Sequence, residues 1–228
     1  MNPNEDANRQ TERDAMIETQ IKARGVRDPR VLDALRSVPR HCFLPETERA
    51  YDDAAQGIGA RQTISQPFIV ALMTESLALR GHETVLEIGA GSGYQTAILA
   101  RLAARVVAVE RHASLARQAG RLLGTLGVAN VSLFVGDGSA GWPDFAPYDA
   151  ILCAAAAPAV PPALIGQLAP GGRLVLPVGP QEAEQRLLLV TKGTDGALAT
   201  RDLGPVLFVP LVGAQGHGLP EDFGDMDI

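Results

Sequence analysis

Val85-Leu-Glu-Ile-Gly-Ala-Gly-Ser-Gly-Tyr-Gln-Thr-Ala-Ile-Leu-Ala100 is the stretch of this 228-residue sequence that decides the fold. It begins as a short apolar strand, turns over Gly89, Gly91 and Gly93, and continues as a helix without a breaker. Glycines in a strand-to-helix turn let another molecule approach the backbone, because no Cβ stands in the way. In an open parallel sheet this turn lies at the carboxyl ends of the strands, where nucleotide-like ligands bind. The stretch therefore predicts a site for a cofactor that contains adenosine.

The glycine spacing and two acidic residues indicate which cofactor binds. The dinucleotide fingerprint is G-x-G-x-x-G, whereas here the third glycine comes one position early, which makes a nicotinamide dehydrogenase a weak alternative. Glu110 ends the second strand, where a carboxylate can accept hydrogen bonds from both ribose hydroxyls. Asp137 and Gly138 follow the third strand, where an aspartate can accept from an adenine amino group. Alternatively, each acid caps the helix that follows it.

Together these features resemble the S-adenosylmethionine-dependent methyltransferases. The resemblance implies S-adenosyl-L-methionine as the cofactor. The residues expected to bind it come from the glycine turn and from the two acidic strand ends. They are Glu87, Gly89, Ala90, Gly91, Ser92, Gly93, Glu110, Arg111, His112, Asp137 and Gly138.

Composition narrows the range of partners and of cellular locations. The net charge of −6 and the pI of about 5.2 disfavour a nucleic-acid substrate, since phosphate binding needs a basic surface. The polar N-terminus lacks the apolar region of a secretory signal, and no apolar run is long enough to span a bilayer. Cys42 and Cys153 lie far apart, and the four histidines show no metal-ligand spacing. We therefore expect a cytoplasmic protein that binds no metal, membrane or nucleic acid.

The order of elements predicts an α/β fold with a doubly wound parallel sheet, Rossmann-like, with an N-terminal helical extension. Helical spacing covers residues 11–38, where Pro29 opens a second helix and Pro39 stops it, and another helix opens at Pro67. Between them residues 40–66 are irregular and polar, which suggests a functional loop. Strands are expected at 85–88, 105–110, 131–135, 148–153 and 173–178, helices at 93–103, 113–126 and 161–168, and antiparallel edge strands at 185–191 and 206–209. The domain is expected to cover 11–213, divided into a helical and substrate-loop region (11–80) and a cofactor-binding core with the edge strands (81–213), with loose tails at 1–10 and 214–228.

Four further motifs point to a substrate. They are Val38-Pro-Arg-His-Cys-Phe43, Ala50-Tyr-Asp-Asp53, Gly59-Ala-Arg-Gln-Thr-Ile-Ser-Gln-Pro67 and Phe208-Val-Pro-Leu211. In this order they resemble the protein-L-isoaspartate (D-aspartate) O-methyltransferase family over about residues 11–213. The resemblance implies a repair enzyme that methylates the α-carboxylate of L-isoaspartyl residues in damaged proteins. The methyl ester then cyclises to a succinimide, which hydrolyses partly back to aspartate.

By the same resemblance, the active-site serine is Ser65. A sulfonium methyl is already electrophilic and a carboxylate is already ionised at neutral pH, so the protein needs to position the carboxylate and exclude water. A serine hydroxyl can donate a hydrogen bond to a carboxylate oxygen, so we expect Ser65 to orient the substrate and not to act as a nucleophile. The alternative for Ser65 is the N-cap of the helix that opens at Pro67. The residues expected to contact the substrate are Arg61, Gln62, Thr63, Ile64, Val209, Pro210 and Leu211, and the family implies a monomer.

Three positions depart from the family pattern. Gly57 replaces a proline, Arg61 replaces a glycine, and Ala154 stands where the family often has threonine. Arg61 would be strained if the position needs φ > 0, but its guanidinium could also pair with a substrate carboxylate. A relative retargeted to another peptide or small-molecule carboxylate, or a cofactor-binding protein without catalysis, is the alternative function.

Overall fold

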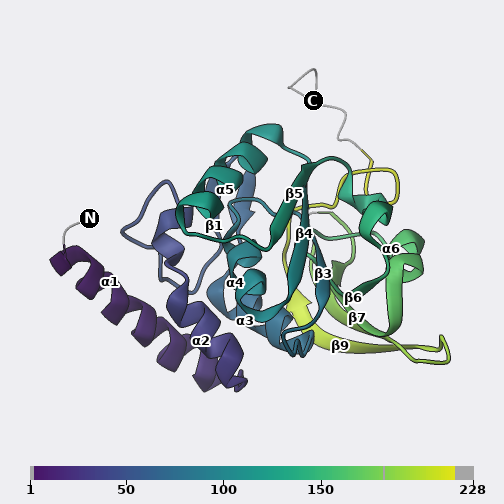
Figure 1. Ribbon diagram of the computed structural model, residues 1–228, viewed down its shortest axis with the longest axis horizontal. Helices are drawn as coiled ribbons and strands as arrows, with labels where there is room; N and C mark the ends of the chain where they lie inside the picture. The colour runs from purple at the N-terminus through teal and green to yellow at the C-terminus, as the bar shows by residue number, and fades with distance from the viewer. Residues whose placement is uncertain (1–2, 182, 219–228) are drawn as a thin grey trace.

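The computed structural model describes residues 3–181 and 183–218, and its centre is a seven-stranded sheet (Figure 1). The strand order is β5-β4-β3-β6-β7-β8-β9, parallel from β5 to β7 and antiparallel from β7 to β9. The strands are β3 (Thr84–Ile88), β4 (Arg105–Glu110), β5 (Val131–Val135), β6 (Tyr148–Cys153), β7 (Leu168–Val178), β8 (Gln185–Lys192) and β9 (Leu198–Val206). The prediction of a parallel sheet with antiparallel edge strands is thus confirmed.

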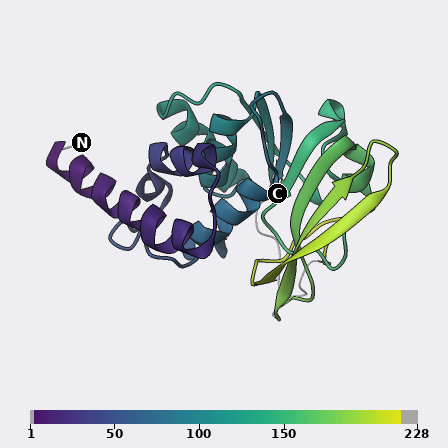
Figure 2. The ribbon, with the colours of Figure 1, turned by 90° about the horizontal axis from the view of Figure 1, so that it is seen from below.

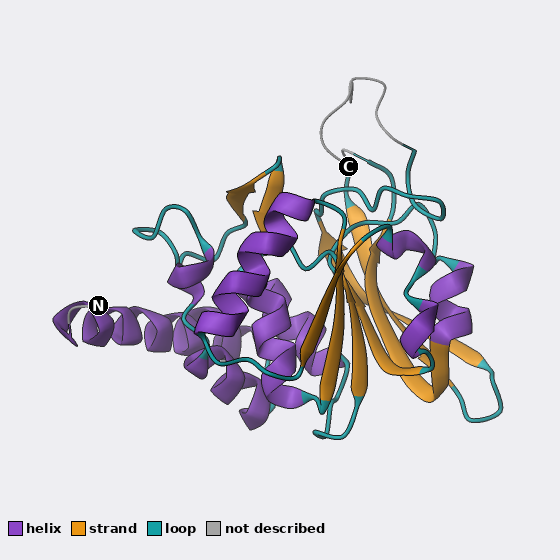
Figure 3. Ribbon diagram, turned by 45° about the horizontal axis from the view of Figure 1, so that its top comes forward, coloured by secondary structure: helices purple, strands orange, loops and turns teal. Residues whose placement is uncertain are grey.

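Helices cover both faces of this sheet (Figure 3). They are α1 (Pro3–Met16), α2 (Pro29–Ser37), α3 (Pro67–Ser76), α4 (Tyr94–Leu102), α5 (Ala113–Thr125) and α6 (Pro162–Gln167). On one face the buried residues of α2 to α5 pack with Val85, Val106 and Ala150. On the other face α6 packs through Leu164 against Leu86. The central strands are buried on both sides, which explains their nearly continuous apolar sequence.

The N-terminal helices lie beside the core and extend beyond it (Figure 2). α1 already begins at Pro3, so residues 3–10, expected to form a loose tail, are helical. A proline is well tolerated in the first helical turn, and the polar residues after it carry no helix breaker. A π-helical turn (Ile17–Ile21) and a 3-10 turn (Lys22–Arg24) follow. α2 begins at Pro29 after the Asp28 cap and ends before Pro39, as predicted.

Residues 40–66 contain more regular structure than we expect from their sequence. A 3-10 turn spans Arg40–Phe43, and β1 (Gln56–Gly59) pairs with β2 (Gln62–Ile64) as an antiparallel hairpin. The two residues of its tip are Ala60 and Arg61, with φ of 49° and 55°. Positive φ at both tip residues suits the right-handed twist of a hairpin. The sequence hides this turn because neither tip residue is glycine or asparagine.

The other differences lie at the C-terminal edge. The strand predicted at 206–209 is instead β9, Leu198–Val206, which is largely exposed because it is the last strand of the sheet. β7 begins at Leu168, where α6 has ended, five residues earlier than predicted (173 − 168). Of the predicted loose tail 214–228, residues 219–228 lie outside the described part of the chain. Within that part no helix could cross a membrane.

Candidate active site

The glycine turn lies between β3 and α4 at the carboxyl end of the sheet, as predicted. Gly91 has φ of 54°, and a Cβ on it would lie 3.2 Å from Ile58 Cδ1. Ile58 belongs to β1, so the hairpin packs directly on the glycine turn. Gly93 has φ of 88° and serves as the N-cap of α4, a conformation that a Cβ would strain. The hairpin, which precedes α3 in the chain, and the glycine turn, which follows α3, are therefore in contact.

Glu110 holds this turn in place. Its Oε2 accepts from the backbone N–H of Gly91 at 2.8 Å, and its Oε1 accepts from that of His112 at 2.8 Å. Only 4% of the residue is exposed. Each carboxylate oxygen keeps a further lone pair, so Glu110 can brace the loop and still accept from ribose hydroxyls. Of its predicted neighbours, Arg111 is exposed, and His112 is partly buried as the N-cap of α5.

Glu87 is the most perturbed group in the site. It is fully buried on β3, and neither of its carboxylate oxygens has a hydrogen-bond partner. Burial raises its pKa to about 8, the charge of Glu110 adds to the rise, and Thr96 opposes it. An acceptor without partners beside a glycine turn fits a ligand that brings a positively charged donor.

Asp137 lies at the end of β5 as predicted. Its Oδ1 accepts from Ser139 N and its Oδ2 from Ala214 N, both at 2.8 Å. Although burial opposes it, these bonds lower the pKa of Asp137, so the group stays ionised. A Cβ on Gly138 would lie 2.6 Å from Ile88 Cγ2, which explains the glycine. Residues 214–215 thus pack against the predicted cofactor site, which their sequence does not indicate.

Ser65 lies between β2 and α3 and is half-buried. The N-cap of α3 is Gln66, which makes no capping hydrogen bond with its own side chain, and Ser65 lies one residue before it, so the alternative that Ser65 is the N-cap is wrong. Asp53, which lies before the hairpin in the sequence, holds the loop between β2 and α3. Its carboxylate accepts from Gln66 Nε2 at 2.7 Å and from Phe68 N at 3.3 Å. These bonds fix the chain on the C-terminal side of Ser65.

The motif of residues 38–43 contains Arg40, whose role the sequence alone does not indicate. Arg40 is fully buried, and its Nε donates to the carbonyl of Ala50 at 2.8 Å. Its Nη2 donates to Ala54 at 3.5 Å. Arg40 thereby holds the turn that carries Asp53, and Asp53 holds the loop that carries Ser65. In the sequence, only the order of the motifs along the chain hints at these contacts.

The late apolar element lies beside the same site. Ala156 N donates to Val209 O at 2.8 Å, and Leu211 N donates to Ala156 O at 2.7 Å. Pro210 pairs with Ala156 in this short parallel bridge. At the same strand exit, Ala154 N donates to Ile88 O at 2.8 Å, immediately before the glycine turn. The predicted substrate residues 209–211 therefore lie next to the exit of β6 and near the cofactor turn.

The predicted residues of the hairpin fall into two groups. Ile64 is buried and packs in the core. Arg61 and Thr63 are exposed, and Gln62 is partly buried.

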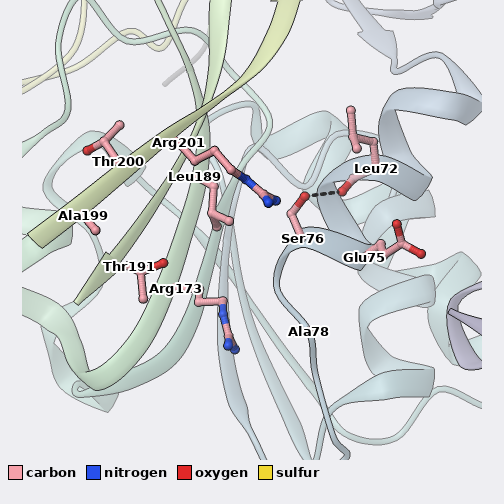
Figure 4. A pocket seen from close by; sticks show the side chains of 10 residues that line it. All are labelled: Leu72, Glu75, Ser76, Ala78, Arg173, Leu189, Thr191, Ala199, Thr200 and Arg201. Atoms are coloured by element: carbon pink, nitrogen blue, oxygen red, sulfur yellow. Dashed lines mark hydrogen bonds between the residues drawn. The ribbon is translucent and has the colours of Figure 1, made fainter. Parts of the chain in front are cut away.

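A hollow of about 460 Å³ lies elsewhere, between the end of α3 and strands β7 to β9 (Figure 4). Arg173 and Arg201 extend into it from the sheet, and Ser76 faces them from α3. Arg173 is level with Ala150 and so with Val85, at the start of β3. The hollow thus lies toward the amino ends of the parallel strands and contains none of the predicted site residues.

The strand order, the glycine turn and the acids at the ends of β4 and β5 define the class of S-adenosylmethionine-dependent methyltransferases. Residues 11–216 match the family model described as protein-L-isoaspartate(D-aspartate) O-methyltransferase. The chain belongs to this family.

Relatives and solved structures agree with this assignment. A protein-L-isoaspartate O-methyltransferase 1 from Syntrophobacter fumaroxidans is 54% identical over 92% of this chain and 98% of the relative. Another of that name, from Anaeromyxobacter sp., is 56% identical over 89% of this chain and 97% of the relative. A solved protein-L-isoaspartate O-methyltransferase superposes with a TM-score of 0.77 at 29% identity, covering 91% of this chain and 66% of that one.

Proposed function

We propose that this chain transfers a methyl group from S-adenosyl-L-methionine to the α-carboxylate of L-isoaspartyl residues in damaged proteins. The methyl ester then forms a succinimide, which returns partly to aspartate. The observation that carries the proposal is the packing of the Ser65 hairpin on the glycine turn through Ile58 and Gly91. This contact brings the family's substrate motif to its cofactor motif. The substrates are proteins and peptides that contain isoaspartyl residues.

Three acids would hold the cofactor. Glu110 accepts from the ribose hydroxyls, and Asp137 accepts from the adenine amino group. Glu87 fits the positively charged amino group of the methionine part, because its two oxygens are buried and have no partner. The cofactor supplies an electrophilic methyl group when bound.

Ser65 then positions the substrate carboxylate. Its hydroxyl donates one hydrogen bond and leaves the carboxylate ionised, as a nucleophile must be. Arg61 and Thr63 contact the peptide from the exposed side of the hairpin, and Val209 to Leu211 contact it from the exit of β6. Holding the two reactants in line and excluding water lowers the barrier without a strong base.

Methyl transfer from labelled S-adenosylmethionine to an isoaspartyl peptide tests the proposal, with the matched aspartyl peptide as control. Ser65→Ala should reduce kcat/KM about 10- to 100-fold, the value of a hydrogen bond to a charged group. Ser76→Ala is the matched control, since Ser76 is the last residue of α3, at the opposite end from Ser65, and donates to the carbonyl of Leu72. Affinity for S-adenosylhomocysteine should not change in either variant. Transfer to neither peptide by a protein that binds the cofactor would refute the proposal and favour a retargeted or non-catalytic relative.

A further inference from the structure

Gln185 is a buried polar residue at the point where the chain leaves the last strand of the sheet. It is 1% exposed and opens β8, where it pairs with Val206, the last residue of β9. Phe208 follows two residues later and begins the element Phe208–Leu211, which the proposed function places beside the substrate. Gln185 is not among the predicted site residues, so its contacts with this element add to the site.

The side-chain amide of Gln185 binds both backbone groups of Phe208. Its Oε1 accepts from Phe208 N at 2.7 Å, and its Nε2 donates to Phe208 O at 3.2 Å. Two residues that exchange both bonds in this way form the hydrogen-bonded pair of an antiparallel ladder. The side chain of Gln185 therefore continues the pairing of β8 with β9 beyond Val206, where the regular strand has ended.

Neighbouring groups fix the orientation of this amide. The Nε2 atom has two hydrogens and also donates to Pro180 O at 3.3 Å. A flipped amide would place its NH2 group against Phe208 N and its oxygen against two carbonyls, so the bonds allow one orientation only. Gly179 packs closely on the stem of the side chain, since a Cβ there would lie 3.1 Å from Gln185 Cγ. The amide is therefore a rigid clamp on Phe208.

The clamp and the substrate element are both attached to the exit of β6. Ala156 N donates to Val209 O at 2.8 Å, and Leu211 N donates to Ala156 O at 2.7 Å. One residue further along, Ala157 O accepts from Gly179 N at 2.9 Å, which fixes the turn that packs on Gln185. The two segments therefore share one support, two residues after the end of the strand.

Phe208 lies between two anchored parts of the chain. The ladder with β8 ends at Val206, and the bonds to Ala156 begin at Val209. Leu207, between them, is 74% exposed and gives the chain little packing there. The two hydrogen bonds from Gln185 thus define the path of the chain from the sheet edge to the substrate site.

We propose that Gln185 is a positioning residue for the peptide substrate, which it affects through Phe208 and the element that follows. This inference rests on the proposed function, which places Val209–Leu211 against the peptide. Without the clamp, the element can pivot about its bonds to Ala156, and peptide binding must then restore its order at a cost in affinity. The acids proposed to hold the cofactor lie at the ends of other strands, so cofactor binding does not depend on the clamp.

Gln185→Met tests the inference, because methionine keeps the length of the side chain and removes its hydrogen bonds. KM for an isoaspartyl peptide should rise about tenfold, while kcat and the affinity for S-adenosylhomocysteine stay at their wild-type values. Asn130→Leu is the matched control. The Asn130 amide donates to Ala100 O and Ala103 O, both at 3.0 Å, immediately before β5 and thus at the amino ends of the parallel strands. This variant should lose stability and keep its KM.

Hydrogen exchange measures the clamp without methyl transfer. The backbone amide of Phe208 should exchange at least about tenfold faster in Gln185→Met than in the wild type, relative to the amides of β3, because a local contact is lost. Asn130→Leu should leave this ratio unchanged. The measurement separates local release of the element from a general loss of stability.

Three results would overturn the inference. They are unchanged exchange at Phe208 in Gln185→Met, unchanged KM in that variant, and an equal rise of KM in Asn130→Leu. Failure of the proposed function looks different, because the wild type itself would then transfer no methyl group to either peptide. That outcome would remove the inference together with the proposed function.

Discussion

Glu87→Gln should change the pH dependence of stability in the cofactor-free protein. The carboxyl of Glu87 is fully buried, and its pKa rises to about 8 from an ordinary value of 4.5. Between these two values the folded protein keeps a proton that the unfolded chain releases. The folded state binds more protons there, so its stability falls as pH rises from about 4.5 to 8 and then levels off.

The size of this effect follows from the shift. Each pKa unit corresponds to about 1.4 kcal/mol, so a shift of about 3.5 units (8 − 4.5) costs up to about 5 kcal/mol above pH 8. About 4 kcal/mol of this loss falls between pH 5 and pH 9. A glutamine at position 87 cannot ionise, so the variant does not show this loss. Burying its amide changes the free energy of unfolding by an amount that does not depend on pH. The difference in stability between the variant and the wild type should therefore grow by about 4 kcal/mol across that range.

Urea unfolding of both proteins at a series of pH values from 5 to 9 measures this difference. Glu83→Gln is the matched control. The carboxylate of Glu83 accepts from Arg80 N and Gly81 N, and although burial opposes them, these bonds lower its pKa. Its contribution is lost only at acid pH, so the control should differ from the wild type by a constant amount between pH 5 and 9. Parallel curves for Glu87→Gln and wild type would refute the reasoning about the buried carboxyl.

Three further substitutions test the geometry of the site. Arg61→Gly should raise the free energy of unfolding by about 1 kcal/mol, since φ of 55° strains a residue with a Cβ; lower stability on thermal unfolding would mean that contacts of Arg61 outweigh the strain. Asp53→Ala should lower the free energy of unfolding by about 1–3 kcal/mol and raise KM for isoaspartyl peptides, because Gln66 and Phe68 N lose their hydrogen bonds to the carboxylate. An unchanged KM would show that Asp53 does not position the substrate loop. Glu110→Ala should weaken binding of S-adenosylhomocysteine at least about tenfold, followed by fluorescence of the single tryptophan, Trp142; equal affinity would exclude Glu110 from the cofactor site.

The core of the fold could be predicted because local signals there agree with the tertiary structure. β4 and β6 have the predicted bounds, since buried parallel strands are short apolar runs bounded by turns. β5 also has the predicted bounds, although it is an edge strand and only partly buried, because four of its five residues are β-branched, aromatic or leucine. β9 could not be predicted in the same way. β9 is largely exposed, and Gly204 and Pro205 interrupt its few apolar residues, so neither a buried apolar run nor an alternation marks it in the sequence. Its position depends on pairing with β8.

Parts of the candidate site were also beyond prediction. The motifs locate Ser65 and Arg61, but the hairpin turn has no glycine or asparagine at its tip to reveal it. The link from Arg40 to Ala50 and from Asp53 to Gln66 joins segments that are distant in sequence. Such hydrogen bonds leave no periodic pattern, so only the tertiary structure shows them.

The sequence by itself determined the class of fold, the family and the chemical groups of the cofactor site. It could do so because the glycine turn of residues 89–93 and the acids at strand ends are local patterns with fixed spacing. The tertiary structure decided which of these groups are buried without partners and which segments hold them. Glu87 is an ordinary carboxyl in the sequence, and only its burial between packed layers raises its pKa to about 8. Burial and charge balance depend on neighbours from the whole chain, and folding alone brings those neighbours together.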